Sequence, residues 1–217
     1  MSGLSPSRFD VVLVDDHAVV REGYRRLLER AAGVVVVGEA ASMAEAMRLD
    51  AELQPDVIVL DIALPGVSGI EVLRRLVAHR PEAKVLIFSM YQDGIYATHA
   101  MNAGARGYLS KASAPDLLVS AVRAVADGGQ YISPDVRLAM TTQSNSAVQL
   151  AQTLSARELE VLRLLAQGFA ADEIALRLGL SPKTAANHQS SIKHKLGAGS
   201  ALQLILIAQQ FGLIVDG

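Results

Sequence analysis

The chain has 217 residues, of which 51% are hydrophobic, and a formal net charge of −2. This length favours one or two domains, and the apolar content supports a sizeable core. The absence of Cys excludes disulfides, thiolate chemistry and Cys-ligated zinc. No signal peptide and no apolar run of about 18 residues is visible, so we expect a cytoplasmic protein without a membrane partner.

Strand-like and helix-like segments alternate over the first 128 residues. The predicted strands are 11–14, 34–37, 57–60, 84–88 and 106–110, and the predicted helices are 17–31, 40–53, 69–79, 93–103 and 115–127. Each strand is short and continuously apolar, which is typical of parallel strands buried on both faces. The pattern therefore predicts an α/β fold with a five-stranded parallel sheet between two helical layers. His79 and His99, on two of the helices, are expected at the surface.

Polar side chains follow four of the predicted strands. Asp15 and Asp16 come after the first, Asp61 after the third, Ser89 ends the fourth and Lys111 follows the fifth. Parallel strands share one carboxyl edge, where open α/β sheets bind ligands, so these groups should converge there. An Asp after a strand is often only a turn former, but three carboxylates in one cleft need a cation, and oxygen ligands suit Mg²⁺. The set predicts phosphoryl chemistry with a carboxylate nucleophile.

Residues 9–127 resemble the receiver domain of bacterial response regulators. The residues that carry the resemblance are Asp15, Asp16, Asp61, Pro65, Ser89, Tyr108 and Lys111. The resemblance implies a flavodoxin-like fold in which a sensor histidine kinase phosphorylates Asp61. It further implies that Mg²⁺ is held by Asp15, Asp16, Asp61 and the backbone carbonyl of Ala63, that Ser89 and Tyr108 form a switch pair, and that Lys111 contacts the phosphoryl group. Phosphorylation would draw Ser89 inward, and Tyr108 would then fill the vacated space from outside.

A change of composition marks the domain boundary. We expect a receiver domain over 1–128, a linker over 129–152 and a second domain over 153–217. Within the linker, 130–140 resembles a short helix, whereas 141–153 is rich in Thr, Gln, Ser and Asn and is expected to be a flexible tether.

The last 65 residues show only helical periodicity, which predicts a small all-α domain. Its first helix begins with a capping box of Ser155 and Glu158. The predicted helices are 155–167, 171–178, 181–196 and 200–210. The second and third, joined by a turn at Gly179, are typical of a helix-turn-helix motif.

The third of these helices has a polar face that suits a major groove. Lys183, Asn187, Ser190 and His194 share this face, and Asn187 could pair with adenine. An ordinary solvated helix face would show the same pattern.

Residues 153–214 resemble the LuxR-type DNA-binding domain, through Leu154–Leu162 and residues such as Gly168, Glu173, Lys183, Thr184, His188 and Lys195. Together with the first domain, the chain is similar to NarL/FixJ-class response regulators, which implies binding to promoter DNA, with Thr184 and His188 added to the DNA-binding residues. Ala186 and Gln189 stand where the family often has cations, and each missing cation removes about one phosphate contact.

The fourth helix is apolar nearly all round. We expect Leu202, Ile205 and Leu206 to form a dimer interface, because one packing face needs fewer apolar residues. A two-fold homodimer formed on activation would match a palindromic operator.

The leading interpretation is a transcription factor that is not an enzyme acting on other substrates, and two other classes of protein compete with it. An Mg²⁺-dependent phosphohydrolase would need a general acid near Asp61, which Ala63 cannot supply. Alternatively, the thin cationic face of the second domain would suit a protein partner instead of DNA.

Overall fold

The five predicted strands form one parallel sheet in the computed structural model, which describes residues 8–113, 115–143 and 145–214. The strands are β1 (Phe9–Val14), β2 (Val34–Ala40), β3 (Val57–Leu60), β4 (Val85–Ser89), β5 (Gly107–Ser110) and β6 (Tyr131–Ile132), in the spatial order β2-β1-β3-β4-β5-β6. The short sixth strand was not predicted. Tyr131 and Ile132 pair with β5, so the short helix expected within 130–140 occupies only the part that begins at Pro134, where a helix start was expected.

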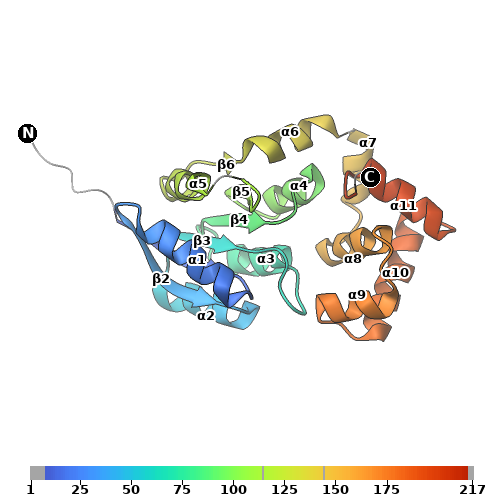
Figure 1. Cartoon of the computed structure of the whole chain (residues 1–217), viewed down its shortest axis with the longest axis horizontal. Coiled ribbons are helices and arrows are strands. Elements are labelled where there is room, and N and C mark those ends of the chain that lie inside the picture. The colour runs from blue at the N-terminus through green and yellow to red at the C-terminus, as the bar shows by residue number, and fades with distance from the viewer. Residues whose placement is uncertain (1–7, 114, 144, 215–217) are drawn as a thin grey trace, which may run out of the picture.

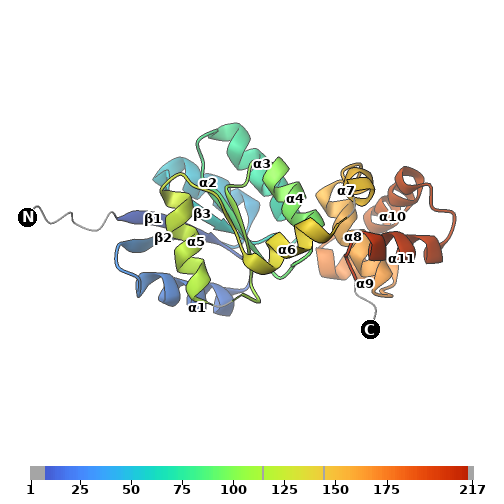
Figure 2. The same ribbon diagram turned by 90° about the horizontal axis from the view of Figure 1, so that it is seen from above.

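Helices cover both faces of this sheet (Figures 1 and 2). They are α1 (Ala18–Glu29), α2 (Met43–Leu53), α3 (Gly69–His79), α4 (Gly94–Asn102) and α5 (Asp116–Ala126). Leu28 of α1 packs with apolar residues of α5 against one face, and α2, α3 and α4 form a second core on the other. These elements make up the α/β domain, and its fold confirms the predicted class.

The segment between the domains is helical and packed, so the expectation of a flexible tether was wrong. It forms α6 (Pro134–Thr142) and α7 (Asn145–Ala151), and both lie against α4. A Cβ on Gly94 would come within 2.6 Å of the Met140 Cα atom, so only glycine allows α6 this close. Contrary to expectation, His99 is buried, and its ring Nε2 donates to the Ala151 carbonyl at 3.2 Å.

The helical domain contains α8 (Ala156–Ala166), α9 (Ala171–Leu178), α10 (Pro182–Leu196) and α11 (Ala201–Gln210). The predicted capping box is present: Ser155 Oγ accepts from Glu158 N, and the Glu158 carboxylate accepts from Ser155 N. Gly179 takes a left-handed conformation, with φ of 63°, in the turn between α9 and α10. This turn completes a helix-turn-helix motif. No helix in the described part of the chain is long and apolar enough to cross a membrane.

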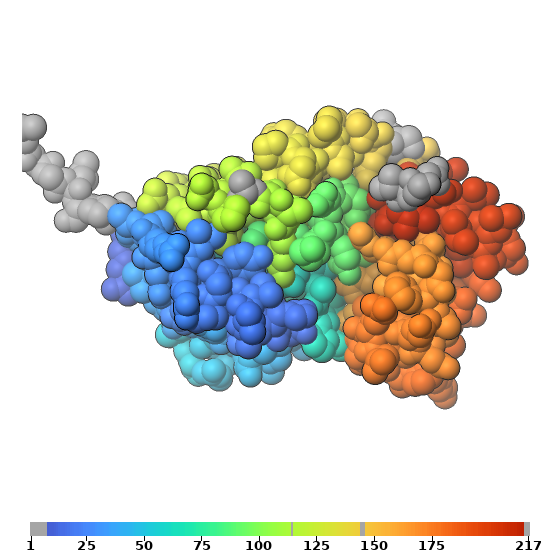
Figure 3. All heavy atoms as spheres, viewed as in Figure 1, coloured from blue at the N-terminus to red at the C-terminus, as the bar shows by residue number. Residues whose placement is uncertain are grey.

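The two domains pack directly against each other (Figure 3). A single apolar cluster runs from Ile62 and Tyr96 in the α/β domain to Leu154 and Ala156 in the helical domain. The Gly66 amide also donates to the Leu178 carbonyl at 3.0 Å, which joins the loop after β3 to the end of α9. The structure therefore shows the domains docked.

Candidate functional site

Two buried carboxylates and one lysine meet at the carboxyl edge of the sheet. Asp15 follows β1 and Asp61 follows β3, and both are buried. Lys111, which follows β5, places its Nζ 2.6 Å from Asp15 Oδ2 and 2.6 Å from Asp61 Oδ2. Three residues that lie up to 96 positions apart in the chain are thus brought together as predicted.

The start of α3 supports Asp61 closely. A Cβ on Gly69 would lie 2.0 Å from the Asp61 carbonyl oxygen, so a larger residue cannot stand at this position. The Ala63 amide donates to Asp61 Oδ1 at 3.2 Å, and the Asp61 amide donates to the Val14 carbonyl. Oδ1 is thus held by the backbone, whereas Oδ2 contacts Lys111 at the carboxyl edge of the sheet.

The electrostatics of this cluster are set by burial and by Lys111. Burial raises the pKa of Asp61 above its ordinary value, Lys111 opposes the rise, and the neighbouring Asp15 adds to it. Burial disfavours the charged form of Lys111, but Asp61 and Asp15 outweigh that effect, so the pKa of Lys111 is raised. Lys111 therefore favours the ionised form of Asp61 against the effect of burial.

The carboxylates at the end of β1 fit a divalent cation. Asp16 Oδ1 is buried and, within the described structure, has no hydrogen-bond partner of good geometry, although His17 Nδ1 lies 2.8 Å away. Oxygen atoms of Asp15 and Asp16 and a ring nitrogen of His17 all lie within 4.8 Å of one another. A buried carboxylate oxygen without a donor is the kind of ligand that Mg²⁺ takes. His17 itself begins α1 at the N-cap position, as expected.

The proposed switch residues lie next to the cluster, but Tyr108 already points inward. Its side chain is fully buried, and its hydroxyl donates to the Tyr91 carbonyl at 2.8 Å. Ser89 is also buried, and its Oγ accepts from the Tyr91 amide at 3.2 Å. The expectation that Tyr108 begins outside was wrong, because its ring belongs to the buried apolar cluster that includes Tyr96 of α4 and Val136 of α6.

The polar face of α10 is open to solvent. Lys183, Asn187, Ser190 and His194 are exposed, as a surface for DNA requires. Thr184 is only partly exposed, and its Oγ1 lies 2.7 Å from the Ser181 Oγ atom at the helix cap.

His188 is half-buried in the helical domain. Burial lowers the pKa of His188, although the nearby Glu158 opposes the change. It is thus less available to DNA than the four exposed residues.

Apolar residues of α11 divide into a buried and an exposed set. Leu204 and Ala208 are buried in the helical domain, whereas Leu202 is 65% and Leu206 49% exposed. Ile205 is half-buried, so it is a weaker candidate for an interface than its two neighbours.

The contacts between the domains were not found from the sequence. Arg163 of α8 donates from Nη1 to Asp93 Oδ2 at 3.0 Å, and its guanidinium lies 4.5 Å from the centre of the Tyr91 ring. Burial raises the pKa of Asp93 to about 6, against the opposing effect of the Tyr96 amide and Arg163. Arg163 belongs to the polar face of α8, and helical periodicity does not say what covers that face.

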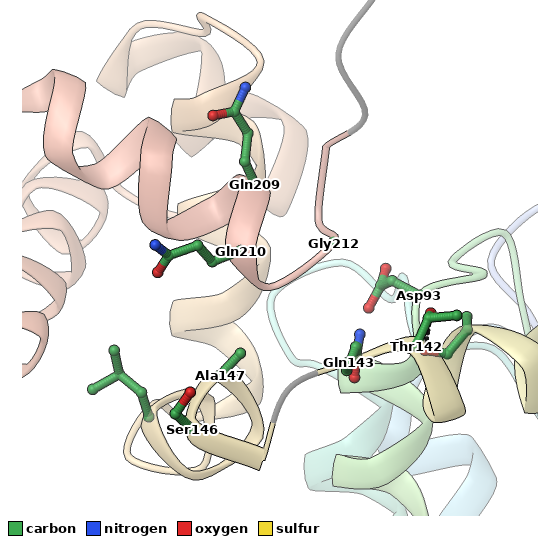
Figure 4. Close-up of a pocket in the computed structure, with 10 residues that line it drawn as sticks. Asp93, Thr142, Gln143, Ser146, Ala147, Gln209, Gln210 and Gly212 are labelled. Atoms are coloured by element: carbon green, nitrogen blue, oxygen red, sulfur yellow. Dashed lines mark hydrogen bonds between the residues drawn. The ribbon is translucent and has the colours of Figure 1, made fainter.

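A crevice of about 560 Å³ lies where the linker helices meet the end of α11 (Figure 4). Gln143, Ser146, Gln209 and Gln210 are among the residues that line it. The Gln143 side chain donates to the Phe211 carbonyl at 3.1 Å, which links the end of α6 to the helical domain.

Comparison with known proteins agrees with this architecture. Residues 11–123 match the response regulator receiver domain, and residues 152–208 match the bacterial regulatory proteins of the luxR family. The chain belongs to the response regulators that join a receiver domain to a LuxR-type DNA-binding domain. It is a two-component regulator of transcription, and proteins built this way are typically not enzymes.

Individual relatives support the same assignment over nearly the whole chain. The response regulator GacA of Pseudomonas aeruginosa is 34% identical over 94% of this chain and 97% of its own length. The oxygen regulatory protein NreC of Staphylococcus carnosus is 37% identical over 90% of this chain and 94% of its own.

Solved structures give the same picture. A LuxR-family response regulator from Aurantimonas is 46% identical, with a TM-score of 0.61, over 62% of this chain and 96% of its own. RcsB of Salmonella enterica, bound to the promoter rprA with a beryllofluoride phosphomimetic, is 27% identical with a TM-score of 0.66, over 94% of this chain and 99% of its own.

Proposed function

We propose that Asp61 accepts a phosphoryl group from a sensor histidine kinase and that this modification controls binding to promoter DNA. A carboxylate oxygen of Asp61 attacks the phosphorus of the phosphohistidine, the P–N bond breaks, and the histidine leaves. The observation that carries the proposal is the distance of 2.6 Å between Lys111 Nζ and Asp61 Oδ2. At this distance the lysine can form an ion pair with a phosphoryl group on Asp61. The chain promotes this self-modification but acts on no other substrate.

Asp15, Asp16, Asp61 and the Ala63 carbonyl would hold Mg²⁺ at this site. When bound, the ion supplies positive charge to the phosphoryl oxygens. Lys111 contacts both Asp15 and Asp61 here, so it keeps the paired carboxylates neutralised. Ser89 lies at the end of β4 as the donor for a phosphoryl oxygen, and Tyr108 is the residue that responds to its movement.

For DNA binding we propose the exposed face of α10. Lys183 would contact a phosphate or guanine, Asn187 an adenine edge, and Ser190 and His194 the rest of the half-site, with Thr184 and His188 in supporting positions. Leu202 and Leu206, with the half-buried Ile205, would pair two copies through α11 on activation. The similar RcsB has been solved as dimers on DNA and bound to a promoter, which supports a dimer on promoter DNA.

The phosphorylation site is tested with acetyl phosphate and Mg²⁺, with the mass of the intact protein as the readout. We expect one added phosphoryl group in the wild type and none in Asp61→Asn. Asp10→Asn is the matched control. Asp10 is a carboxylate near the start of β1, whereas Asp15 follows the other end of that strand. Labelling of Asp61→Asn at the wild-type level would place the nucleophile elsewhere.

The DNA face is tested by mapping bound fragments of the host genome and then measuring affinities for the selected site. Asn187→Ala should lose about 1–3 kcal/mol of discrimination at one base pair. Lys183→Ala should weaken binding to all sequences and lower the salt dependence. Unchanged affinity in both variants would exclude this face of α10.

A further inference from the structure

The face of α8 that meets the receiver domain carries a buried carboxylate. Ala156, Glu160, Arg163 and Gln167 are spaced by four, three and four residues, so they share one side of the helix. Glu160 is only 1% exposed. Glu158 differs, because it turns inward to Lys195 and Ser191 of its own domain.

The Glu160 carboxylate lacks part of its hydrogen bonding in the docked structure. Arg157, one turn before it on α8, donates to Oε2, but Oε1 has no hydrogen-bond partner of good geometry in the described structure. Burial raises the pKa of Glu160 to about 7 despite Arg157 and the Ser68 hydroxyl, which both favour the charged form. Such a group is expensive to bury as an anion, so it responds strongly to any charge placed beside it.

The surroundings of Glu160 belong to the phosphorylation site. Ser68 stands at the N-cap of α3, yet its hydroxyl makes no cap hydrogen bond and is buried near Glu160. Ser68 pairs with Ala63 in the loop that follows Asp61. The charge on Asp61 also raises the pKa of Glu160. The first helix of the DNA-binding domain thus presents a carboxylate to the loop that carries the phosphorylated residue.

We propose that Glu160 senses the charge on Asp61 and that its repulsion by the phosphoryl group drives the helical domain off the receiver domain. The proposal rests on the function proposed above for Asp61. A phosphoryl group adds up to about two negative charges, and the buried Glu160 has no route to water while α8 remains docked. Undocking hydrates the carboxylate and also breaks the contact between Gly66 and Leu178, which holds the turn before α10 against the receiver domain.

Undocking can be measured as a distance between two spin labels. The chain has no native Cys, so Ala78→Cys and Ala170→Cys, at exposed positions of α3 and at the start of α9, give one label on each domain. Dilution with unlabelled protein restricts the distances to those within one chain. Beryllofluoride with Mg²⁺ serves as the phosphoryl mimic, at a pH well above the Glu160 pKa of about 7, so that the carboxylate is ionised in the docked protein.

We expect the mimic to raise the ratio of undocked to docked protein about tenfold or more in the labelled wild type. Glu160→Gln, which keeps the shape and removes the charge, should reduce that rise to about threefold or less. Asp172→Asn removes an exposed carboxylate of the same domain and should respond as the wild type does. Equal opening of Glu160→Gln and wild type, or no opening of the wild type, would overturn the inference.

A second variant tests the same idea without the mimic. Ser68→Asp keeps a good N-cap for α3 and places a permanent charge beside Glu160. It should be undocked on its own, and the double variant with Glu160→Gln should dock again. A docked Ser68→Asp would contradict the inference. Failure of acetyl phosphate to label Asp61 would instead contradict the proposed function, so the two failures are distinguishable.

Discussion

Arg163 of the DNA-binding domain donates a hydrogen bond to Asp93 of the receiver domain, with Nη1 3.0 Å from Oδ2. Asp93 also accepts from the Tyr96 amide and so caps α4, the helix that follows Ser89 and the Tyr91 backbone. One carboxylate therefore serves both the start of α4 and the docking of the second domain. A change in the loop between β4 and α4 can reach the DNA-binding domain through this contact.

Arg163→Ala should weaken docking by about 1–3 kcal/mol, because it leaves a buried carboxylate without its cation. Arg163 lies on α8, away from the exposed face of α10, so the expected result is tighter DNA binding in the absence of phosphorylation. Gel retardation of the unphosphorylated protein measures this. Arg75→Ala is the control, since Arg75 pairs with Glu71 on an exposed helix face, where ion pairs contribute little. Equal affinities of wild type and Arg163→Ala would show that this contact does not restrain DNA binding.

Stability should depend on pH through Glu160. Its pKa rises from an ordinary 4.5 to about 7 in the folded protein, so the folded state binds this proton more tightly than the unfolded state. The resulting stabilisation is complete below pH 4.5 and is lost as the pH rises through 7. The free energy of unfolding of the wild type, minus that of Glu160→Gln, should fall by on the order of 2–3 kcal/mol over this range.

Urea unfolding at several pH values measures that difference. Asp172→Asn should run parallel to the wild type, because Asp172 is exposed. A wild-type curve parallel to that of Glu160→Gln would mean that Glu160 is hydrated in the folded protein.

Lys111→Met should destabilise the protein by about 3 kcal/mol, because the buried Asp15 and Asp61 lose their shared cation. Added Mg²⁺ should recover part of the loss and recover more in this variant than in the wild type, since the ion then neutralises both carboxylates. Thermal unfolding with and without Mg²⁺ gives the comparison. Arg48→Met, which removes a cation from an exposed pair with Glu52, should show neither effect. An Mg²⁺ response of equal size in Lys111→Met and wild type would argue against a shared site.

Leu206→Asp should prevent dimer formation without unfolding the helical domain, because the Leu206 side chain is 49% exposed in the single chain. Loss of the second half-site should then lower the affinity for a palindromic operator by roughly 100-fold. Sedimentation of the activated protein and gel retardation measure the two effects. Leu138→Asp, at an exposed leucine of α6, is the control. A dimer of normal stability in Leu206→Asp would exclude α11 as the interface.

The strands, the polar residues at their ends and the helix caps could be predicted because each depends on a pattern of neighbouring residues. Apolar runs such as Val57–Leu60 predict buried parallel strands. The residues that follow parallel strands all lie at the same edge of the sheet. That rule alone predicts that Asp15, Asp61 and Lys111 lie close together. The Ser155 capping box and the turn at Gly179 could be predicted in the same way, since each depends only on near neighbours.

The short strand β6, the helix α7 and the burial of His99 could not be predicted from patterns of neighbouring residues. The strand at Tyr131 is two residues long, too short for periodicity to register. Helix α7 has polar residues, and it is placed by packing of Ala147 and Ala151 against α4 rather than by any strong helical signal. His99 looked like a surface residue because its partner, the Ala151 carbonyl, lies 52 positions away.

The sequence by itself therefore determined two domains, an acidic cluster with its lysine, and a helix with an exposed polar face, because each follows from spacing along one strand or helix. Only the tertiary structure decided that Arg163 meets Asp93 and that Glu160 is buried beside Ser68. Contacts between domains depend on the relative position of whole surfaces, and a polar helix face shows the same periodicity whether water or another domain covers it.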